Sequence, residues 1–444
     1  MRVESRLSWL AVAAGSALCA SVAEVGADAR WLAALGGTIA RVGRIPSSIP
    51  YAAAPSHDWV NVPVLGELVF HWLEALGGDR ALVTAQAVAV AATLALLLRD
   101  MRAAGASDGA RALVLVGIPF AAVSALFVVR AQLFSLPLFA LAVVLLRAEA
   151  RRPSRRIWLI VPLLALWSNL HGAVLLGLVV VTAYLLLERI RRERWTALGV
   201  LVGSWGALFA TPALARTGDY YLGVMHGVPA ASGFGLWAPL SLRNPLDVLF
   251  VAVGLPLLWY AVRARPRTWE LACLAVLAAS AVHVGRNSVW LVLFAAVPAA
   301  AGLPLQRARA TPRALVAAAW AVPVFLLATA FVQAPKQTVA GPALRADAVR
   351  LAAGKPILAD AEDAEKLALD GRRVWIANPI DAFDRRDQRL YVSWLRGRPV
   401  GDALLRHHDV VLVQIDSLPQ VRLARRGSFR EVARDAAAVL YARR

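Results

Sequence analysis

Residues 81–98 read ALVTAQAVAVAATLALLL, a stretch without any charged side chain that is followed directly by Arg99 and Asp100. A helix crosses the core of a bilayer with roughly 20 apolar residues, so this stretch predicts a membrane span. Similar runs recur up to residue 332. We expect eleven spans, centred on residues 8–26, 81–98, 112–129, 131–146, 157–170, 173–187, 196–211, 245–262, 268–284, 288–304 and 314–332.

The composition of the whole chain agrees with a membrane protein. Of its 444 residues, 59% are hydrophobic and 17% are charged, and the mean hydropathy is +0.59. An average soluble chain is roughly 45–50% apolar and about 25% charged. The difference excludes a soluble enzyme, a disordered chain and a fibrous protein. Cys19 and Cys273 both lie in apolar runs, which excludes a disulfide framework and a thiolate metal site.

The net charge of +19 follows the membrane topology and does not indicate a nucleic-acid partner. The arginines form short clusters between apolar runs, without the basic groove or aromatic motif of an RNA-binding protein. With the N-terminus inside, 20 of the arginines before residue 333 fall in cytoplasmic segments and 8 fall outside. Because basic loops stay in the cytoplasm, we expect a cytoplasmic N-terminus and an extracytoplasmic C-terminus. The first apolar run also resembles a cleavable signal peptide, but we favour a retained helix.

Two regions do not read as membrane spans. The first is an outer loop, residues 27–80, in which segments 31–42 and 65–76 could form amphipathic helices on the membrane surface. The second is the tail, residues 333–444, with short apolar runs of strand length at 356–359, 374–377 and 410–413 and a helical stretch at 361–369. We therefore predict a transmembrane domain over residues 1–332 and a small extracytoplasmic α/β domain over 333–444.

Unusual polar residues gather at the outer face once this topology is applied. They are Asp28, His57, Asp58, Trp59 and Glu67 in the first loop, with Arg130, Gln132, Asn169, His171, Arg286 and Asn287 at the later outer turns. Each has an ordinary explanation: an arginine at a helix end can extend to the lipid headgroups, and Asn287 or Asp28 can begin a helix. Together, acids and arginines on one face fit a reaction at a phosphate-bearing lipid, since arginine neutralises phosphate and a carboxylate can act as general base.

Short motifs along nearly the whole chain resemble the polytopic GT-C glycosyltransferases, and more narrowly a bacterial family of GT-C-like membrane proteins. They are Asp28-Ala-Arg-Trp31, Gly36-Gly37, Gly43-Arg-Ile-Pro46, His57-Asp58-Trp59, Leu65-Gly66-Glu67, Gly77-Gly78, Arg130-Ala-Gln132-Leu-Phe134, Trp167-Ser-Asn169-Leu-His171-Gly172 and Arg286-Asn287. The resemblance implies an α-helical polytopic protein of the bacterial cytoplasmic membrane. It also implies sugar transfer from a polyprenyl-phosphate carrier to a glycan, lipid or protein acceptor at the outer face.

By position, the resemblance places the catalytic acid at Asp28, with Asp58 as the next candidate. It implies an inverting hexosyl- or pentosyltransferase in which Arg130 and Arg286 bind the lipid phosphate, His171 binds phosphate or positions the sugar, and Trp59 stacks on a sugar ring. His57, Glu67, Gln132, Asn169 and Asn287 complete the predicted substrate site. The first loop has no Asp-Xaa-Asp or Glu-Xaa-Asp pair, so the cofactor is left unassigned, with a divalent metal as the candidate.

Two other classes of function stay open. A transporter or flippase for a lipid-linked saccharide would have proline-broken spans, and Pro119, Pro137, Pro162 and Pro256 lie inside predicted spans. A non-catalytic assembly protein would act through its tail. That reading gains weight from Leu236-Trp237, where relatives tend to have Glu-Trp.

Overall fold

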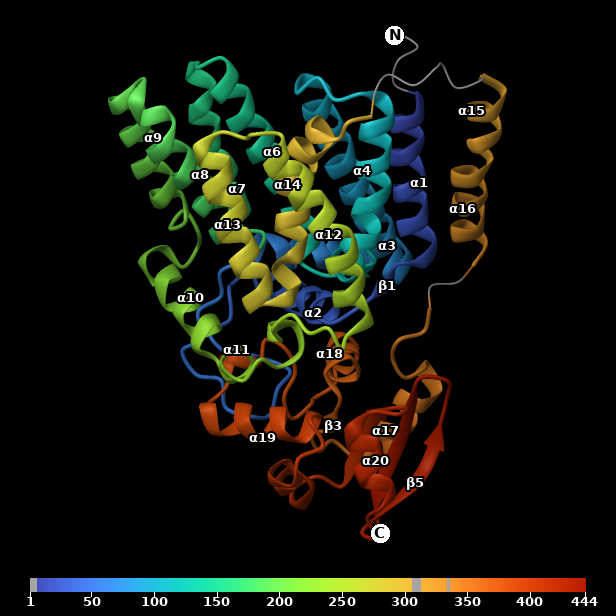
Figure 1. Cartoon of the computed structure of the whole chain (residues 1–444). Coiled ribbons are helices and arrows are strands. Elements are labelled where there is room, and N and C mark those ends of the chain that lie inside the picture. The colour runs from blue at the N-terminus through green and yellow to red at the C-terminus, as the bar shows by residue number, and fades with distance from the viewer. Residues whose placement is uncertain (1–5, 306–312, 334–335) are drawn as a thin grey trace. The chain divides into compact units, whose positions relative to one another are not determined.

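The structure, a computed structural model, describes residues 6–305, 313–333 and 336–444 (Figure 1). Arg2, Arg307 and Arg309 of the predicted basic segments lie outside the described residues. The chain divides into two compact units. Unit 1 holds Met1–Ala23, Arg80–Thr211 and Leu236–Ala334, and unit 2 holds Glu24–Asp79, Pro212–Gly235 and Pro335–Arg444. The domain boundary expected at residue 332 stays a prediction.

Unit 1 consists of apolar helices, because the charge-free runs can bury their backbone polar groups only by internal hydrogen bonding. Its helices are α1 (Arg6–Val22), the second part of α3 (Val64–Ala103), α4 (Asp108–Ala121), α5 (Val123–Leu126), α6 (Gln132–Arg151), α7 (Ile160–Ser168), α8 (Val174–Leu187), α9 (Arg194–Ala207), α12 (Pro245–Arg263), α13 (Thr268–His283), α14 (Ser288–Gly302), α15 (Arg313–Ala319) and α16 (Ala321–Val332). The two-residue strand β2 (Val128–Val129) precedes α6.

The core of unit 1 lies around α14, whose residues 288–300 are all buried. Large aromatic side chains fill the space between helices: the ring of Phe139 on α6 lies 5.2 Å from that of Trp290 on α14 and 6.4 Å from that of Trp167 on α7. Trp269 on α13 and Trp167 are fully buried. Aromatic contacts of this kind fix how neighbouring helices pack.

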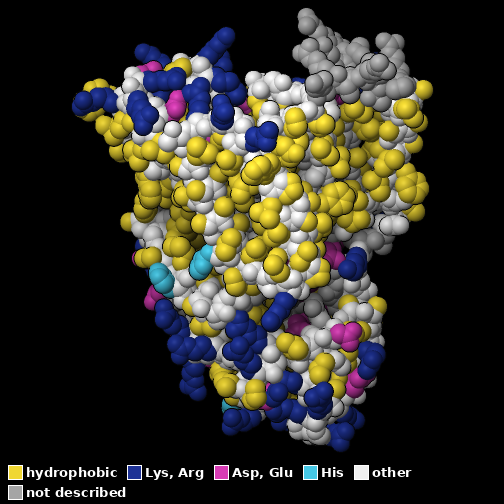
Figure 2. Space-filling model, in the orientation of Figure 1, with side chains coloured by type: hydrophobic (Ala, Val, Ile, Leu, Met, Phe, Trp, Pro, Cys, Tyr) yellow, Lys and Arg dark blue, Asp and Glu magenta, His cyan; other side chains and the backbone are white. Residues whose placement is uncertain are grey.

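An apolar belt covers the outside of unit 1. Figure 2 shows hydrophobic side chains along the helices and Lys and Arg gathered at one end of them. Among the described residues, four helices are long and apolar enough to cross a membrane: Val64–Ala103, Gln132–Arg151, Pro245–Arg263 and Ala314–Val332. Exposed apolar surface of this extent indicates lipid contact. The protein therefore has a helical, multi-pass membrane fold, while the count of eleven spans stays a prediction.

Unit 2 combines the first loop with the tail. Its elements are β1 (Glu24–Val25), α2 (Ala29–Val42), the start of α3, α10 (Thr217–His226), α11 (Val228–Ala231), α17 (Pro342–Ala352), β3 (Leu358–Ala359), α18 (Ala361–Leu369), α19 (Arg385–Leu395), β4 (Val410–Gln414), α20 (Leu418–Ala424), β5 (Phe429–Arg434) and β6 (Ala438–Arg443). Four strands form a mixed sheet in the order β3-β4-β6-β5, with β3 and β4 parallel and the other neighbouring pairs antiparallel.

Residues 374–377 do not form a strand, so that prediction is wrong. Val374 forms only isolated bridges, to Ala52 and to Ile357. The backbone of the first loop takes up its hydrogen bonds, since the Ala53 N–H donates to the Val374 carbonyl at 2.8 Å. Asn378-Pro379 then follows, and proline supplies no donor to extend a ladder. The stretch expected to be helical at 361–369 is α18.

Two glycine pairs shape the first loop. A Cβ on Gly36 would lie 2.1 Å from the carbonyl oxygen of Glu67, so only glycine lets α2 approach the start of α3 this closely. The second pair interrupts α3, where Gly77 (φ −167°, ψ 20°) and Gly78 (φ 57°, ψ −143°) leave the helical conformation. The segments expected to be helical at 31–42 and 65–76 accordingly form α2 and the first part of α3.

Candidate functional site

Asp28 stands at the start of α2 in a conformation that is rare for a residue with a Cβ, with φ 82° and ψ −31°. Its N–H donates to both carboxyl oxygens of Glu365 at 3.1 Å. The indole Nε1–H of Trp31 donates to Asp28 Oδ1 at 3.1 Å. Although Asp28 occupies the N-cap position, its side chain makes no capping hydrogen bond. The carboxylate is therefore oriented by Trp31 and is not used to begin the helix.

Glu365 on α18 holds the backbone of Asp28 in this strained state. The Glu365 side chain is fully buried, and its Oε1 also accepts a 2.6 Å hydrogen bond from Asn378 Nδ2. Burial, together with the nearby charge of Asp28, holds the pKa of Glu365 well above its usual range. A residue with positive φ costs on the order of 1–3 kcal/mol and persists only where its surroundings hold it. Glu365 and Asn378 supply those surroundings.

Further carboxyl groups approach Asp28 within unit 2. Burial, with a contribution from the charge of Asp28, raises the pKa of Asp381 to about 6. Burial raises the pKa of Tyr220, and the charges of Asp381, Glu67 and Asp28 act in the same direction. Unit 2 thus brings an acid from the first loop, one from α3 and one from the tail around one tyrosine. Perturbed groups in such a cluster are typical of functional sites.

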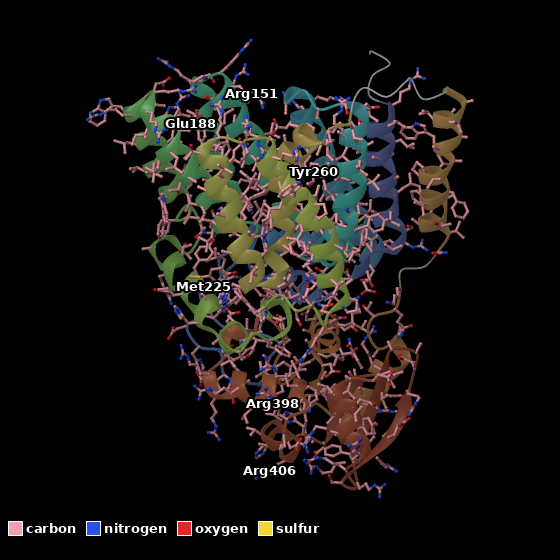
Figure 3. All side chains as sticks on the ribbon, in the orientation of Figure 1. Arg151, Glu188, Met225, Tyr260, Arg398 and Arg406 are labelled. Carbon is pink, nitrogen blue, oxygen red and sulfur yellow. The ribbon has the colours of Figure 1, made fainter. Side chains whose placement is uncertain are left out.

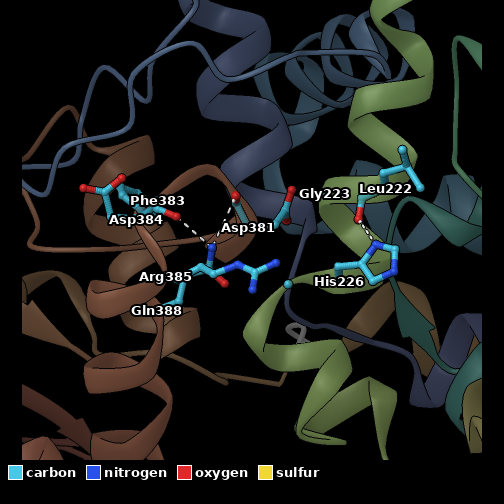
Figure 4. A pocket seen from close by; sticks show the side chains of 9 residues that line it. Leu222, Gly223, His226, Asp381, Phe383, Asp384, Arg385 and Gln388 are labelled. Carbon is cyan, nitrogen blue, oxygen red and sulfur yellow. Dashed lines mark hydrogen bonds between the residues drawn. The ribbon is translucent and has the colours of Figure 1, made fainter.

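A pocket of about 460 Å³ lies beside this cluster and is lined by α10, α19 and the segment before α19 (Figure 4). Figure 4 shows the guanidinium of Arg385 extending into the pocket between Asp381 and His226. His226 Nδ1 lies 2.9 Å from the Leu222 carbonyl oxygen, to which it donates, so its Nε2 is left as an acceptor. The Gln388 side chain supports the backbone around the pocket: its Oε1 accepts from Val228 N–H, and its Nε2 donates to the Phe383 carbonyl.

The other first-loop residues predicted for the site differ in exposure. His57 and Asp58 are exposed, and the hydrogen bond that Asp58 makes with another described residue comes from its backbone carbonyl, which accepts from Arg216 at 3.1 Å. Trp59 is 8% exposed, which leaves little ring surface for the predicted stacking on a sugar. Glu67 is fully buried, and its Oε2 accepts from Asn61 Nδ2 at 2.8 Å. The catalytic alternative at Asp58 therefore lacks the neighbours that Asp28 has.

In unit 1, a hydrogen-bond chain positions His171 at the turn between α7 and α8. Trp167 Nε1–H donates to Ser135 Oγ at 2.6 Å, and Ser135 Oγ lies 2.7 Å from His171 Nδ1. The backbone N–H of Ala173 also donates to His171 Nδ1, at 3.4 Å, so Nδ1 acts as an acceptor and the proton of the neutral ring lies on Nε2. Arg286 lies close enough for its charge to act on the His171 ring. Two of the predicted phosphate-binding residues are thus neighbours.

Of the remaining predicted residues of unit 1, some stay candidates for binding substrate and others have side chains that bond to neighbouring parts of the protein. Arg286 stacks on Trp237, with its guanidinium carbon 3.9 Å from the ring centroid. Asn287 Nδ2 donates to Ser280 Oγ and does not cap α14, and Asn169 Nδ2 donates to the carbonyls of Ala165 and Ala210. Gln132, the first residue of α6, is buried, and Arg130, two residues before it, is half-buried. The side chains of Asn169 and Asn287 therefore connect neighbouring segments of unit 1 through hydrogen bonds.

The sequence analysis missed Glu365, Asn378, Asp381, His226 and Arg385. Glu365 and Asn378 lie more than 300 residues from Asp28, and no local motif joins them. One signal was available, since Asp363 and Glu365 lie among the buried alanines and leucines of α18, and carboxyls are rarely buried without a partner. Within residues 6–305, 313–333 and 336–444, no group of three or more His, Cys, Asp or Glu side chains is arranged to hold a metal ion.

Comparison with known proteins finds similarity in structure and not in sequence. No protein-family model matches the chain, and no curated protein matches it. The arabinofuranosyltransferase AftD from mycobacteria superposes with a TM-score of 0.50 at 15% identity over 98% of this chain, and the match covers 41% of AftD. ArnT from Cupriavidus metallidurans, solved with undecaprenyl phosphate, has a TM-score of 0.43 at 14% identity, with 98% of this chain and 97% of ArnT covered. At these identities the comparison shows the fold alone: over 98% of its length this chain shares the fold of AftD.

Proposed function

We propose that this protein transfers a sugar from a polyprenyl-phosphate carrier to an acceptor hydroxyl at the outer face of the membrane. The observation that carries the proposal is the state of Asp28: a carboxylate in a strained backbone conformation, oriented by Trp31, held by Glu365, and close enough for its charge to act on Asp381, which lines a polar pocket. Strain at a residue that its surroundings hold firmly is a frequent mark of a functional site.

The chemistry needs one base and no strong acid. The acceptor oxygen attacks C1 of the sugar, its proton passes to the Asp28 carboxylate, and the bond between C1 and the phosphate oxygen breaks. The phosphate leaves with the bonding electron pair as a stable anion. Attack from the face opposite the phosphate inverts the configuration at C1. A positioned general base typically contributes about 10²–10⁴-fold to such a rate.

We assign the pocket of unit 2 to the acceptor. Its lining offers a guanidinium from Arg385, a ring nitrogen from His226 and carboxyl groups from Asp381 and Asp384. These groups can donate to and accept from several hydroxyls at once, as carbohydrate recognition requires. The charge of Asp28 acts on Asp381, which supports a hydroxyl held near the base.

We assign the lipid phosphate to the arginines of unit 1. Stacking on Trp237 fixes the plane of the Arg286 guanidinium, and a fixed fork suits the oxygens of a phosphate. His171 Nε2–H would add a second donor. Arg130, at the turn before α6, completes the proposed set.

The proposed topology has eleven spans, a cytoplasmic N-terminus and an extracytoplasmic C-terminus. It rests on the basic character of every loop assigned to the cytoplasm. A reporter fused after Arg444 should be exported, and a reporter inserted near Arg152 should stay in the cytoplasm. A cytoplasmic signal from the fusion at Arg444 would contradict the assignment of the site to the outer face.

The decisive test is transfer of labelled sugar from a polyprenyl-phosphate donor in membranes that contain this protein. Donors carrying a pentose and a hexose should be assayed in parallel, because the fold does not identify the sugar. Label should move into a glycan, lipid or protein fraction in the wild type and stay on the donor with Asp28→Asn. If both proteins leave the label on every donor while flipping of the donor across the membrane depends on the protein, the transporter reading replaces this one.

A further inference from the structure

A second pocket, in unit 1, lies at the end of the helices where arginine gathers. It has a volume of about 210 Å³ and is lined by the end of α6, the turn between α12 and α13, and the C-terminal part of α14. Figure 2 shows Lys and Arg concentrated at this end, and Figure 3 places Arg151 and Glu188 there. Nothing in the proposed transfer reaction uses these residues.

Ion pairs already occupy three of the four arginines that line this pocket. Arg147 Nε donates to Glu270 at 2.8 Å, and its Nη1 donates to Asp100 at 3.3 Å. Arg151 also bonds Asp100, at 3.0 Å, and Arg267 bonds Glu188 at 2.5 Å. These pairs build the pocket wall and leave its charge close to balanced.

The fourth arginine, Arg265, supplies the excess positive charge. It lines the pocket, is exposed and makes no ion pair with any described residue. Its φ of 53° places it in the left-handed region, which is uncommon for a residue with a Cβ. The turn between α12 and α13 thus presents a cation whose charge no described carboxylate balances.

A buried donor also lines the pocket. Trp269 is fully buried between the rings of Tyr184 and Phe294, at 5.3 and 5.9 Å. Its indole Nε1–H has no hydrogen-bond partner among the described residues. A buried donor without a partner is destabilising, so an acceptor from outside the chain would offset a real penalty.

We propose that this pocket binds the phosphate of an anionic phospholipid headgroup. Arg265 pairs with the phosphate charge and Trp269 Nε1–H donates to one of its oxygens. The volume is below the roughly 300–1,000 Å³ of pockets that enclose drug-sized ligands, which suits a headgroup better than a nucleotide. Exposed apolar side chains continue from the pocket along α12 and α13, namely Val262, Trp259 and Leu271, and can lie against acyl chains. Basic pockets between helices at this membrane surface suit anionic lipids.

The test measures binding of short-chain phosphatidylglycerol to the full chain in neutral detergent by native mass spectrometry. Arg265→Glu should weaken binding about tenfold or more, since charges at this surface each contribute about 1 kcal/mol. Arg263→Glu is the matched control. It removes the same charge from the end of α12, where Arg263 is exposed and does not line the pocket, and it should change binding less than about threefold. Equal losses of lipid affinity in Arg265→Glu and Arg263→Glu would overturn the proposal that this pocket binds the lipid.

A second variant and a second probe separate this site from general attraction. Trp269→Phe removes the indole donor together with one of the two fused rings, so it should weaken lipid binding about fivefold and also lower the thermal midpoint of the lipid-free protein, because a fully buried side chain becomes smaller. Unchanged affinity in this variant overturns the proposal. Glycerol 3-phosphate and inorganic phosphate should not displace the lipid at millimolar concentration. If either does, the site binds a free phosphate and the lipid assignment fails.

Discussion

Asp28 and Asp58 lie in the same loop, carry the same side chain and both have positive φ, 82° and 55°, yet their surroundings differ. Asp28 is half-buried, its N–H is fixed by a buried carboxyl and its Oδ1 accepts from an indole. Asp58 is exposed and offers only its backbone carbonyl to Arg216. A rare backbone angle alone therefore does not mark a functional site. Partners that hold the angle and direct the side chain do.

Among the changes in these two acids and their neighbours, Asp28→Asn should have the largest effect on transfer. Asparagine keeps the size and the acceptor for Trp31 but cannot take a proton, so transfer should fall by about 10²–10⁴-fold. The measurement is the initial rate of labelled sugar transfer, with the amount of folded protein checked by its thermal midpoint. A rate within about threefold of wild type would remove Asp28 from the chemistry.

Glu365 offers a matched pair of changes. Because burial raises the pKa of Glu365 well above its usual range, its site favours a neutral side chain, and Glu365→Gln, which keeps an oxygen acceptor for the Asp28 N–H, should keep the rate within about threefold. Glu365→Ala removes the acceptor for Asp28 N–H, and an unpaired buried donor costs about 1–3 kcal/mol. We expect about a tenfold lower rate and a lower thermal midpoint for Glu365→Ala. Equal rates in the two variants would show that Glu365 does not hold Asp28.

The dependence of stability on pH tests the burial of carboxyl groups on α18, the helix that also carries Glu365. Burial raises the pKa of Asp363 on α18 to about 7, above the roughly 3.9 of an unfolded aspartate. The folded state therefore binds more protons between about pH 4 and pH 7, and stability falls as pH rises through this window. Asp363→Asn keeps the acceptor for Ala340 N–H, which Oδ1 now binds at 2.7 Å.

The expected result for Asp363→Asn is a higher thermal midpoint than wild type at pH 8, by a few degrees, and no gain at pH 4. Scanning fluorimetry of the full chain in detergent at several pH values gives both midpoints. Parallel pH profiles for the two proteins would mean that Asp363 stays charged when folded, contrary to the burial argument.

The smallest effect should come from Asp58→Asn. Its side chain is exposed and bonds to no described residue, and surface changes usually alter stability by less than about 0.5 kcal/mol. Transfer should stay within about threefold of wild type. Loss of activity in Asp58→Asn, with Asp28→Asn unaffected, would exchange the roles of the two acids and assign the base to the His57-Asp58-Trp59 segment.

The sequence predicts the helices of unit 1 well because apolar runs without charge have few alternatives in a membrane. Asp28 becomes the catalytic candidate only through the resemblance, by its position just after the first run, and that role stays a prediction. It could not predict Glu365, Asn378 or Asp381, since their approach to Asp28 depends on how α18 and the segment before α19 fold in unit 2. Trp59 shows the opposite error: an aromatic residue in a loop looked available for a sugar, while its burial shows that it packs.

The break at Gly77-Gly78 has a consequence for how α3 exchanges its amide hydrogens. Helical cooperativity passes from residue to residue through consecutive backbone hydrogen bonds, and a φ of 57° with a ψ of −143° at Gly78 interrupts that series. Residues 64–76 and 79–103 should therefore open as independent segments, with separate protection factors, although they follow one another in the chain. Deuterium uptake that rises together in both segments would show that opening passes through the glycine pair.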